Sequence, residues 1–181
     1  MEEKKDIFDL ISTAAREKDV QQLMECNRTT EKYGIVLSVE DARMLSESRI
    51  EAQKKHRRVE FGEGILPEIL RMFCDSPYIQ ADDFVQTAAE LQDLFFQYKN
   101  EAAEQLTDAE LLNFMREQFD RVCYGSLELL GGTCLERFAR AIREGYSGYE
   151  VSEGCGEYDQ FSEEEGWNSE LYYEILHELL G

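Results

Sequence analysis

The heptapeptide FCDSPYI, residues 73–79, sets a cysteine, an aspartate and a serine side by side, and enzymes build nucleophiles from such side chains. A nucleophile of this kind needs a base within hydrogen-bond reach, which is most often histidine. The chain has only two histidines, and neither stands in a nucleophile motif such as Gly-x-Ser-x-Gly. Pro77 disfavours helix at the residue before it, while Asp75 and Ser76 can hydrogen-bond backbone groups at a helix end. We therefore predict a corner between two helices, and no catalytic residue.

Two clusters of cations could bind an anion. KKHRR covers residues 54–58, and Arg137, Arg140 and Arg143 recur every three residues along one edge of a predicted helix. Nucleic acid or an acidic partner is one interpretation of such clusters. The other is a set of cations at a helix C-terminus, worth about 0.3–1 kcal/mol each, or ion pairs with the protein's own acids. The acidity of the chain favours this second interpretation.

Metal and cofactor ligands have little support in the sequence. The five cysteines contain no Cys-x-x-Cys pair, and residues 163–165 lack the Asp and Gly spacing of a calcium loop. Glu174 and His177 form one Glu-x-x-His pair, whereas a di-iron bundle uses two. A glycine-rich phosphate loop is missing as well. We expect no metal and no cofactor, and five free thiols in a reducing compartment.

The chain is strongly acidic, with a net charge of −20 over 181 residues and a pI of about 4.4. The first 58 residues balance 12 Lys and Arg against 12 Asp and Glu, so the excess lies after Arg58. A negative field repels nucleic acid and anionic membranes and attracts basic proteins. We find neither a signal-peptide pattern nor the run of about 20 apolar residues that crosses a membrane. We expect a cytoplasmic protein whose partner is another protein of basic character, and not a nucleic acid or a membrane.

Apolar residues recur at helical spacing along most of the chain, and only 2 prolines and 12 glycines interrupt it. This pattern predicts an all-α fold: one compact domain of about seven or eight helices over residues 1–146. An acidic loop rich in glycine and aromatic residues follows over 147–166, and an amphipathic C-terminal helix over 167–181. We expect that helix to dock on its own domain or on another chain, which would partly shield Trp167 at its start.

Capping residues predict where the helices begin. Four polar residues stand at N-cap positions before apolar, helically spaced runs: Asp19, Ser38, Thr107 and Thr133. The two threonines are each followed three residues later by a glutamate, which is the pattern of a capping box. Pro67 is expected in the first turn of its helix, where its missing N–H costs nothing.

Glycines predict where the helices end, and we expect ends near Gly34, Gly125 and Gly145. LELLGG, residues 127–132, is expected to be one helical turn followed by a break. After the FCDSPYI corner, a helix should begin near Ala81, with Asp82 and Asp83 in its first turn, where the helix dipole favours acids.

Several phrases of the sequence together resemble an uncharacterised bacterial family known only as a domain of unknown function. They are TEKYGIVLSVEDA, RVEFGEGI, FCDSPYI, FFQYKNE and GSLELLGG, and the likeness runs over roughly residues 22–143. The first residues and the acidic tail lie outside it. The resemblance implies a bacterial cytoplasmic setting, and no activity, cofactor or catalytic residue.

Three functional hypotheses remain open from the sequence. The first is a non-enzymatic helical module that binds another protein through an acidic or apolar face. The second is an enzyme or enzyme accessory with a pocket near residues 57–78, built from Arg57, Arg58, Glu60, Asp75 and Tyr78. The third is an acidic mimic of nucleic acid that occupies a DNA-binding protein.

Overall fold

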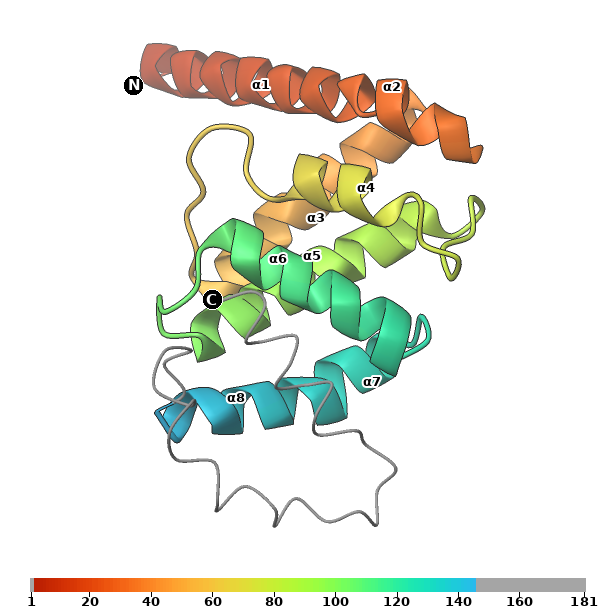
Figure 1. The fold of residues 1–181 in the computed structure, drawn as a ribbon. Coiled ribbons are helices and arrows are strands. Elements are labelled where there is room, and N and C mark those ends of the chain that lie inside the picture. The colour runs from red at the N-terminus through yellow and green to blue at the C-terminus, as the bar shows by residue number, and fades with distance from the viewer. Residues whose placement is uncertain (1, 146–181) are drawn as a thin grey trace, which may run out of the picture. The chain divides into compact units, whose positions relative to one another are not determined.

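The computed structural model describes residues 2–145, and every regular element in that range is a helix (Figure 1). The α-helices are α1 (Glu2–Glu25), α2 (Asn27–Thr30), α3 (Val39–His56), α4 (Leu66–Phe73), α5 (Phe84–Glu101), α6 (Asp108–Glu117), α7 (Leu127–Leu129) and α8 (Leu135–Arg143). The all-α prediction is confirmed. Six of these helices have eight residues or more, whereas α2 and α7 are single turns, so the described range holds fewer full helices than expected. The predicted loop and helix over 147–181 lie outside the described residues.

By its internal contacts the chain divides into two compact units, the first ending at Phe96 and the second beginning at Gln97, within α5. In the first unit α1 packs along α3, and both α1 and α2 contact α4. Figure 1 shows α1 as the long red helix that continues past its contact with α3 toward the N-terminus. The large apolar side chains buried in this unit include Leu23, Leu37, Leu45, Leu66, Ile69, Leu70, Phe73, Phe84, Leu91 and Phe95.

Helix α1 runs unbroken through Asp19, so the prediction that a second helix begins there was wrong. Neither glycine nor proline occurs between residues 2 and 25 to interrupt it. The carboxylate of Asp19 does not cap α1; it accepts hydrogen bonds from Ser46 and Arg49 on α3. A tertiary contact, invisible to local sequence rules, explains why an aspartate stands in the middle of this helix.

Hydrogen bonds from side chains to the backbone, and not a β-sheet, stabilise the connection between α2 and α3. Asn27 donates from Nδ2 to the carbonyl of Leu37 at 2.9 Å and accepts from its N–H at 2.7 Å. The Thr30 hydroxyl donates to the carbonyl of Ile35 at 2.8 Å. Ile35 and Leu37 are buried while Val36 between them is 63% exposed. The apolar run Ile-Val-Leu is therefore an extended segment that buries its first and third side chains in the unit.

The predicted boundaries of this connection are confirmed. Gly34 has φ +78°, a conformation that glycine adopts at little cost, and it ends the short 3₁₀ turn Glu31–Tyr33. Ser38 is the N-cap of α3: its hydroxyl accepts from the N–H of Asp41 at 3.1 Å, and its own N–H donates to the Asp41 carboxylate at 2.8 Å. This reciprocal pair satisfies backbone donors that a helix start leaves free.

The segment FCDSPYI is the predicted corner after α4. Pro67 lies in the first turn of α4, and the helix ends at Phe73, which is fully buried. Ser76 is 5% exposed; its N–H donates to the Phe73 carbonyl at 3.0 Å, and its hydroxyl accepts from the N–H of Tyr78 at 3.3 Å. Ser76 thus stabilises the turn by hydrogen bonds to its backbone groups.

Helix α5 begins at Phe84, later than the start expected near Ala81. Asp82 and Asp83 precede the helix, so their predicted place in its first turn was wrong. The Asp83 carbonyl accepts the N–H of Thr87 at 2.9 Å. Asp82 and Asp83 therefore lie in the segment that leads into α5.

The second unit, from Gln97 onward, has three buried aromatic rings at its centre. Tyr98, Phe114 and Phe138 are each fully buried, and their ring centroids lie 5.1–6.1 Å apart in tilted arrangements. Such pairs contribute about 0.5–1.5 kcal/mol beyond their burial. The Tyr98 hydroxyl donates to the Leu130 carbonyl at 2.7 Å, which satisfies its one polar atom inside the core.

Helix α6 begins at the predicted capping box of Thr107 and Glu110. The Thr107 hydroxyl accepts from the N–H of Glu110 at 3.3 Å, and the Glu110 carboxylate accepts from the N–H of Thr107 at 2.8 Å and from its hydroxyl at 2.7 Å. The hydrogen bonds from the side chain and then the backbone of Thr107 lower the pKa of Glu110 below its ordinary value of 4.5. Leu106 before the N-cap and Leu111 at the fourth position of the helix are both buried, which is the arrangement of a hydrophobic staple.

This lowered pKa predicts a pH-dependent contribution to stability. A carboxyl whose pKa falls on folding stabilises the folded state above its unfolded pKa, and loses that effect as the pH falls through the folded pKa. Glu110→Gln should therefore unfold more easily than the parent at neutral pH, by less than about 1 kcal/mol for so exposed a charge. The gap should close as the pH is lowered below 4.5. Urea unfolding of both proteins across this pH range measures it, and a gap that widens in acid would contradict the assignment.

Two π-helical turns, Gln118–Val122 and Leu130–Cys134, adjoin α6 and α8. The second one runs through both glycines of LELLGG and directly into α8, so the expected break was wrong. Thr133 lies inside this turn and Cys134 precedes α8 without a side-chain cap, so the capping box expected at Thr133 was wrong too. Gly125 and Gly145, at φ +82° and +83°, follow helical segments as predicted.

Candidate functional site

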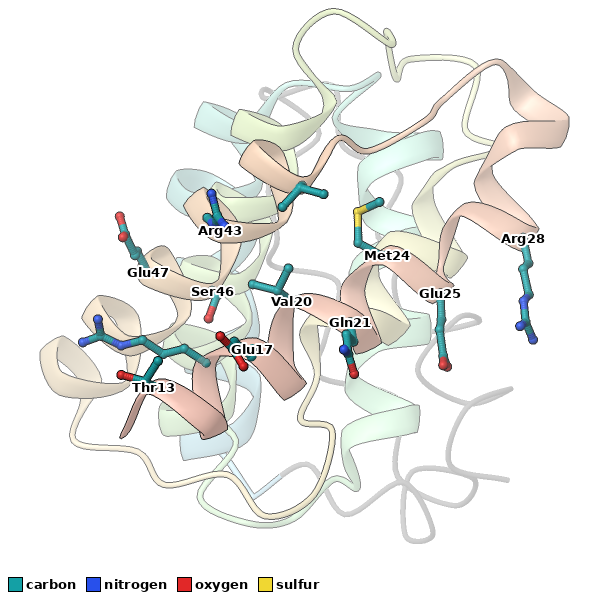
Figure 2. Close-up of a pocket in the computed structure, with 12 residues that line it drawn as sticks. Thr13, Glu17, Val20, Gln21, Met24, Glu25, Arg28, Arg43, Ser46 and Glu47 are labelled. Atoms are coloured by element: carbon teal, nitrogen blue, oxygen red, sulfur yellow. The ribbon is translucent and has the colours of Figure 1, made fainter. Parts of the chain in front are cut away.

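A groove of about 800 Å³ lies between α1 and α3 in the first unit (Figure 2). We call it the α1–α3 groove. The residues that line it are Thr13, Arg16, Glu17, Val20, Gln21, Met24, Glu25, Arg28, Val39, Arg43, Ser46 and Glu47. Its volume is in the range of pockets that hold a ligand or a segment of chain.

Helical periodicity explains how these residues come to share one groove. On α1 they follow the i, i+3, i+4, i+7 pattern of a single helix face from Thr13 to Glu25, and Arg28 on α2 continues it. On α3 the spacing from Val39 to Glu47 is of the same kind. Two stripes, one on each helix, therefore form the two walls.

The groove has an apolar centre and a rim of mixed charge. Val20 and Met24 are half-buried, and Val39 is 48% exposed. Figure 2 shows Met24 pointing to one side of α1 and Glu25 and Arg28 pointing to the other. Three arginines and three glutamates share the lining: Arg16, Arg28 and Arg43 with Glu17, Glu25 and Glu47. The site therefore offers apolar contact and charges of both signs, with no net charge.

The apolar surface continues along α1 beyond the groove. Ile7, Leu10 and Ile11 are 54%, 69% and 61% exposed. Leu10 stands one helical turn before Thr13, on the same face. Isolated apolar side chains on a surface are ordinary, but a cluster beside a groove is typical of an interaction site.

One wall of the groove is fixed by a buried ion cluster, which we call the Arg49 cluster. Arg49 of α3 is 9% exposed and lies between two carboxylates, donating from Nη1 to Asp19 on α1 and from Nε to Glu60 at 3.0 Å. Ser46, which lines the groove, donates to the second oxygen of Asp19 at 2.6 Å. The amide of Gln53 donates to Glu60 at 2.9 Å. These bonds tie α1 to α3 at a fixed spacing.

Glu60 also connects the cluster to the start of α4. Its Oε1 accepts the N–H of Ile65 at 2.7 Å, which satisfies a free donor at the N-cap of that helix. Gly64 has φ +71°, and a Cβ there would meet Nη2 of Arg49 and lie 2.7 Å from Oε2 of Glu60. Only glycine leaves room for the guanidinium and its carboxylate at this place. Within the phrase RVEFGEGI, Glu60 thus provides the carboxylate that pairs with Arg49, and Gly64 leaves the space that the guanidinium occupies.

The five residues proposed for a pocket near 57–78 have different placements. Arg57 ends α3 in the left-handed conformation at φ +53°, and Arg58 follows it half-buried. Asp75 and Tyr78 are exposed at the corner after α4. The Glu60 carboxylate is committed to the Arg49 cluster, and none of the five lines the α1–α3 groove. Trp167, the sixth candidate, lies outside the described residues.

The cations of KKHRR partly pair with the protein's own acids, as one of the two interpretations predicted. Lys55 donates to both oxygens of Asp93 on α5, at 2.8 and 3.0 Å. Nε2 of His56 lies 2.8 Å from the same carboxylate, and its ring packs against Phe96 with centroids 6.0 Å apart. This side chain contributes to the packing of α3 on α5, and neither histidine nor cysteine lines the groove.

Residues 2–145 contain neither a metal-binding cluster nor a membrane-spanning helix. No group of three or more His, Cys, Asp or Glu side chains there is arranged to hold a metal ion. None of the helices in that range has both the length and the apolar character for crossing a membrane.

The described part of the chain is thus all-α and carries a two-helix groove between α1 and α3. The chain belongs to the family of unknown function DUF6323, whose model matches residues 22–148. The match includes Arg49, Glu60 and Gly64, while Asp19 and the groove residues from Thr13 to Gln21 precede it. Searches of curated proteins and of solved structures gave no significant match.

Proposed function

We propose that the protein is a non-enzymatic, cytoplasmic interaction module whose α1–α3 groove binds an amphipathic helix of another protein. The observation that carries this proposal is the groove itself, with its apolar centre between two helices and its rim of mixed charge. A helix laid in such a groove presents apolar anchors at i, i+3, i+4 and i+7 to the centre and polar residues to the rim.

The rim also indicates what kind of helix fits. Its equal numbers of arginine and glutamate call for a partner with charges of both signs along its edges. The groove lies in the charge-balanced first 58 residues, so the protein's net charge of −20 has no direct part in this contact. A mixed-charge partner is a better match here than the basic partner that the overall composition favours, and its binding should weaken only modestly with salt.

Burial of the apolar side chains at the centre of the groove does not by itself supply the binding free energy of a stable complex. Full burial of a valine or methionine contributes about 1.5–3 kcal/mol, and these side chains are already half-buried. Val20, Met24 and Val39 together would then give about 3 kcal/mol, whereas a micromolar complex needs about 8 kcal/mol. The partner must therefore also cover Leu10 and pair with the rim, which argues for a segment of several helical turns.

The alternative hypotheses have weaker support. An enzyme site near residues 57–78 would need Glu60 as a free carboxylate, and Glu60 is engaged with Arg49, Gln53 and Ile65. A mimic of nucleic acid would need acids aligned on one surface, and the groove has as many arginines as glutamates. We therefore favour the interaction module.

Two exposed valines provide a matched test. Val39 lines the groove and is 48% exposed, whereas Val36 is 63% exposed and does not line it. Val39→Glu places a charge against the apolar anchors of the bound helix and should reduce partner recovery at least about tenfold, the equivalent of 1.4 kcal/mol. Val36→Glu should leave recovery unchanged. The measurement is quantitative mass spectrometry of proteins purified with each tagged variant from the native cell.

Both variants should melt close to the parent, because both side chains are exposed, and a thermal unfolding curve checks this. Equal recovery of the same proteins with Val39→Glu and with the parent would contradict the groove as the binding surface.

A further inference from the structure

Two buried thiols of the second unit lie against each other. Sγ of Cys123 is 3.3 Å from Sγ of Cys134, and each residue is 2% exposed. Cys26 and Cys74 are also buried, but their thiols donate to backbone carbonyl oxygens, and Arg71 donates to the sulfur of Cys26. Among the four described cysteines, the 123–134 pair is the one in which two sulfurs come within hydrogen-bond distance.

The chain reversal between the two π-helical turns brings these thiols together. Cys123 directly follows the turn Gln118–Val122, and its N–H donates to the Gln118 carbonyl at 2.8 Å. Tyr124 and Gly125 then adopt φ +49° and +82°, which turns the chain back. Ser126 caps α7, and the turn Leu130–Cys134 brings the second thiol against the first. The contact is therefore defined by backbone geometry.

We propose that Cys123 and Cys134 form a redox modification site, which a small peroxide converts reversibly to a disulfide. The bond requires the sulfurs to approach from 3.3 Å to about 2.05 Å, a movement of little more than 1 Å. Because both thiols are 2% exposed, the oxidant must be small and uncharged, and hydrogen peroxide meets both conditions. This proposal is independent of the groove and its partner.

The surroundings give the two sulfurs different roles. The hydrogen bond between the two thiols lowers the pKa of Cys134, with help from the Arg137 guanidinium and against the effect of burial. The same hydrogen bond, followed by burial, raises the pKa of Cys123. Cys134 is therefore the thiolate that attacks first, since the thiolate is the nucleophile in cysteine oxidation.

The reaction balances in two steps. The Cys134 thiolate attacks one oxygen of hydrogen peroxide, the O–O bond breaks, and the departing hydroxide takes a proton, leaving a sulfenic acid and water. The Cys123 sulfur then attacks the sulfenic sulfur, the S–O bond breaks, and hydroxide leaves as water with the Cys123 proton. Overall two thiols and one peroxide give one disulfide and two waters, and two electrons pass from sulfur to oxygen.

Peptide mapping of the whole protein after peroxide treatment tests the proposal. The expected product joins the peptides of Cys123 and Cys134 with the loss of two hydrogens, and dithiothreitol reverses it. Cys26 and Cys74 serve as internal controls, since they are equally buried and should stay reduced at the same dose. Oxidation of these controls ahead of the pair, or a disulfide from either thiol to Cys155, would overturn the assignment.

Single serine variants separate the two roles. Cys123→Ser should stop at the sulfenic acid of Cys134, which dimedone traps as a stable adduct. Cys134→Ser removes the thiol whose pKa Arg137 helps to lower and leaves the buried Cys123, which should therefore give less adduct at the same dose. Equal labelling of both variants would contradict the roles. If either variant fails to fold, as its thermal melt would show, the map of the parent protein alone decides the site.

Discussion

Replacing Arg49 with methionine should lower the free energy of unfolding by about 3–5 kcal/mol, the cost of breaking a buried ion pair by removing one partner. Methionine fills a similar volume, so the loss measures charge and hydrogen bonding more than packing. It leaves the carboxylates of Asp19 and Glu60, whose side chains are 16% and 11% exposed, without their shared cation. Urea unfolding followed by circular dichroism measures the effect.

Arg43 provides the matched control on the same helix. Its nearest acid, Glu40, is 3.6 Å away, and the two side chains are 63% and 74% exposed. Arg43→Met should therefore cost no more than about 1 kcal/mol, the range of surface pairs. Adding Glu60→Gln to Arg49→Met should recover part of the loss by removing one orphaned charge. Equal losses in Arg49→Met and Arg43→Met would show that the Arg49 cluster does not hold α1 against α3.

Replacing Gly64 with alanine should be the second most damaging change, for two reasons that add. The residue has φ +71°, where an L side chain costs about 1–2 kcal/mol. The new Cβ would also displace the guanidinium of Arg49, which two carboxylates hold in place. Displacement forfeits part of the pairing energy, so we expect a total loss of about 3 kcal/mol or more.

Gly62 isolates the two contributions. It has φ +74°, almost the same backbone conformation, and a Cβ there would meet nothing within 4 Å. Gly62→Ala should therefore show only the backbone cost of about 1–2 kcal/mol. The excess loss in Gly64→Ala is the cost of crowding Arg49 and Glu60, and it should shrink when Arg49→Met is already present. An undiminished excess in that background would contradict the close approach to Arg49.

The features that the sequence predicts correctly depend on residues close together in the chain. The N-cap at Ser38, the capping box at Thr107 and the turn glycines Gly34 and Gly125 are of this kind, because their partners stand within a few positions. The failures have distant causes. Asp19 looks like an N-cap, but its partners are on α3. Thr133 looks like one as well, but the chain enters α8 from a π-helical turn.

The candidate site depends on a tertiary contact in the same way, because two helices form its walls. Glu60 in the phrase RVEFGEGI is a candidate for a pocket near residues 57–78. In the structure its carboxylate pairs with Arg49 and has a structural role. Val20 and Met24 belong to α1, and only the pairing of α1 with α3 shows that they line a groove. The sequence does contain one indication of the groove: the residues from Thr13 to Glu25 that line it recur at the spacing of a single helix face. This spacing is continuous only if Asp19 lies within the helix.

The central claim is that the α1–α3 groove binds a helix of another protein, and site-specific photo-crosslinking in the native cell tests it most directly. A photoreactive amino acid replaces Gln21, an exposed residue of the groove, or Gln86, an exposed residue of α5 outside it. The account predicts a crosslink from position 21 to one protein, on peptides of amphipathic helical pattern, which Val39→Glu abolishes. Position 86 should give no such crosslink. The same product from both positions, or a crosslink from position 21 that survives Val39→Glu, would contradict it.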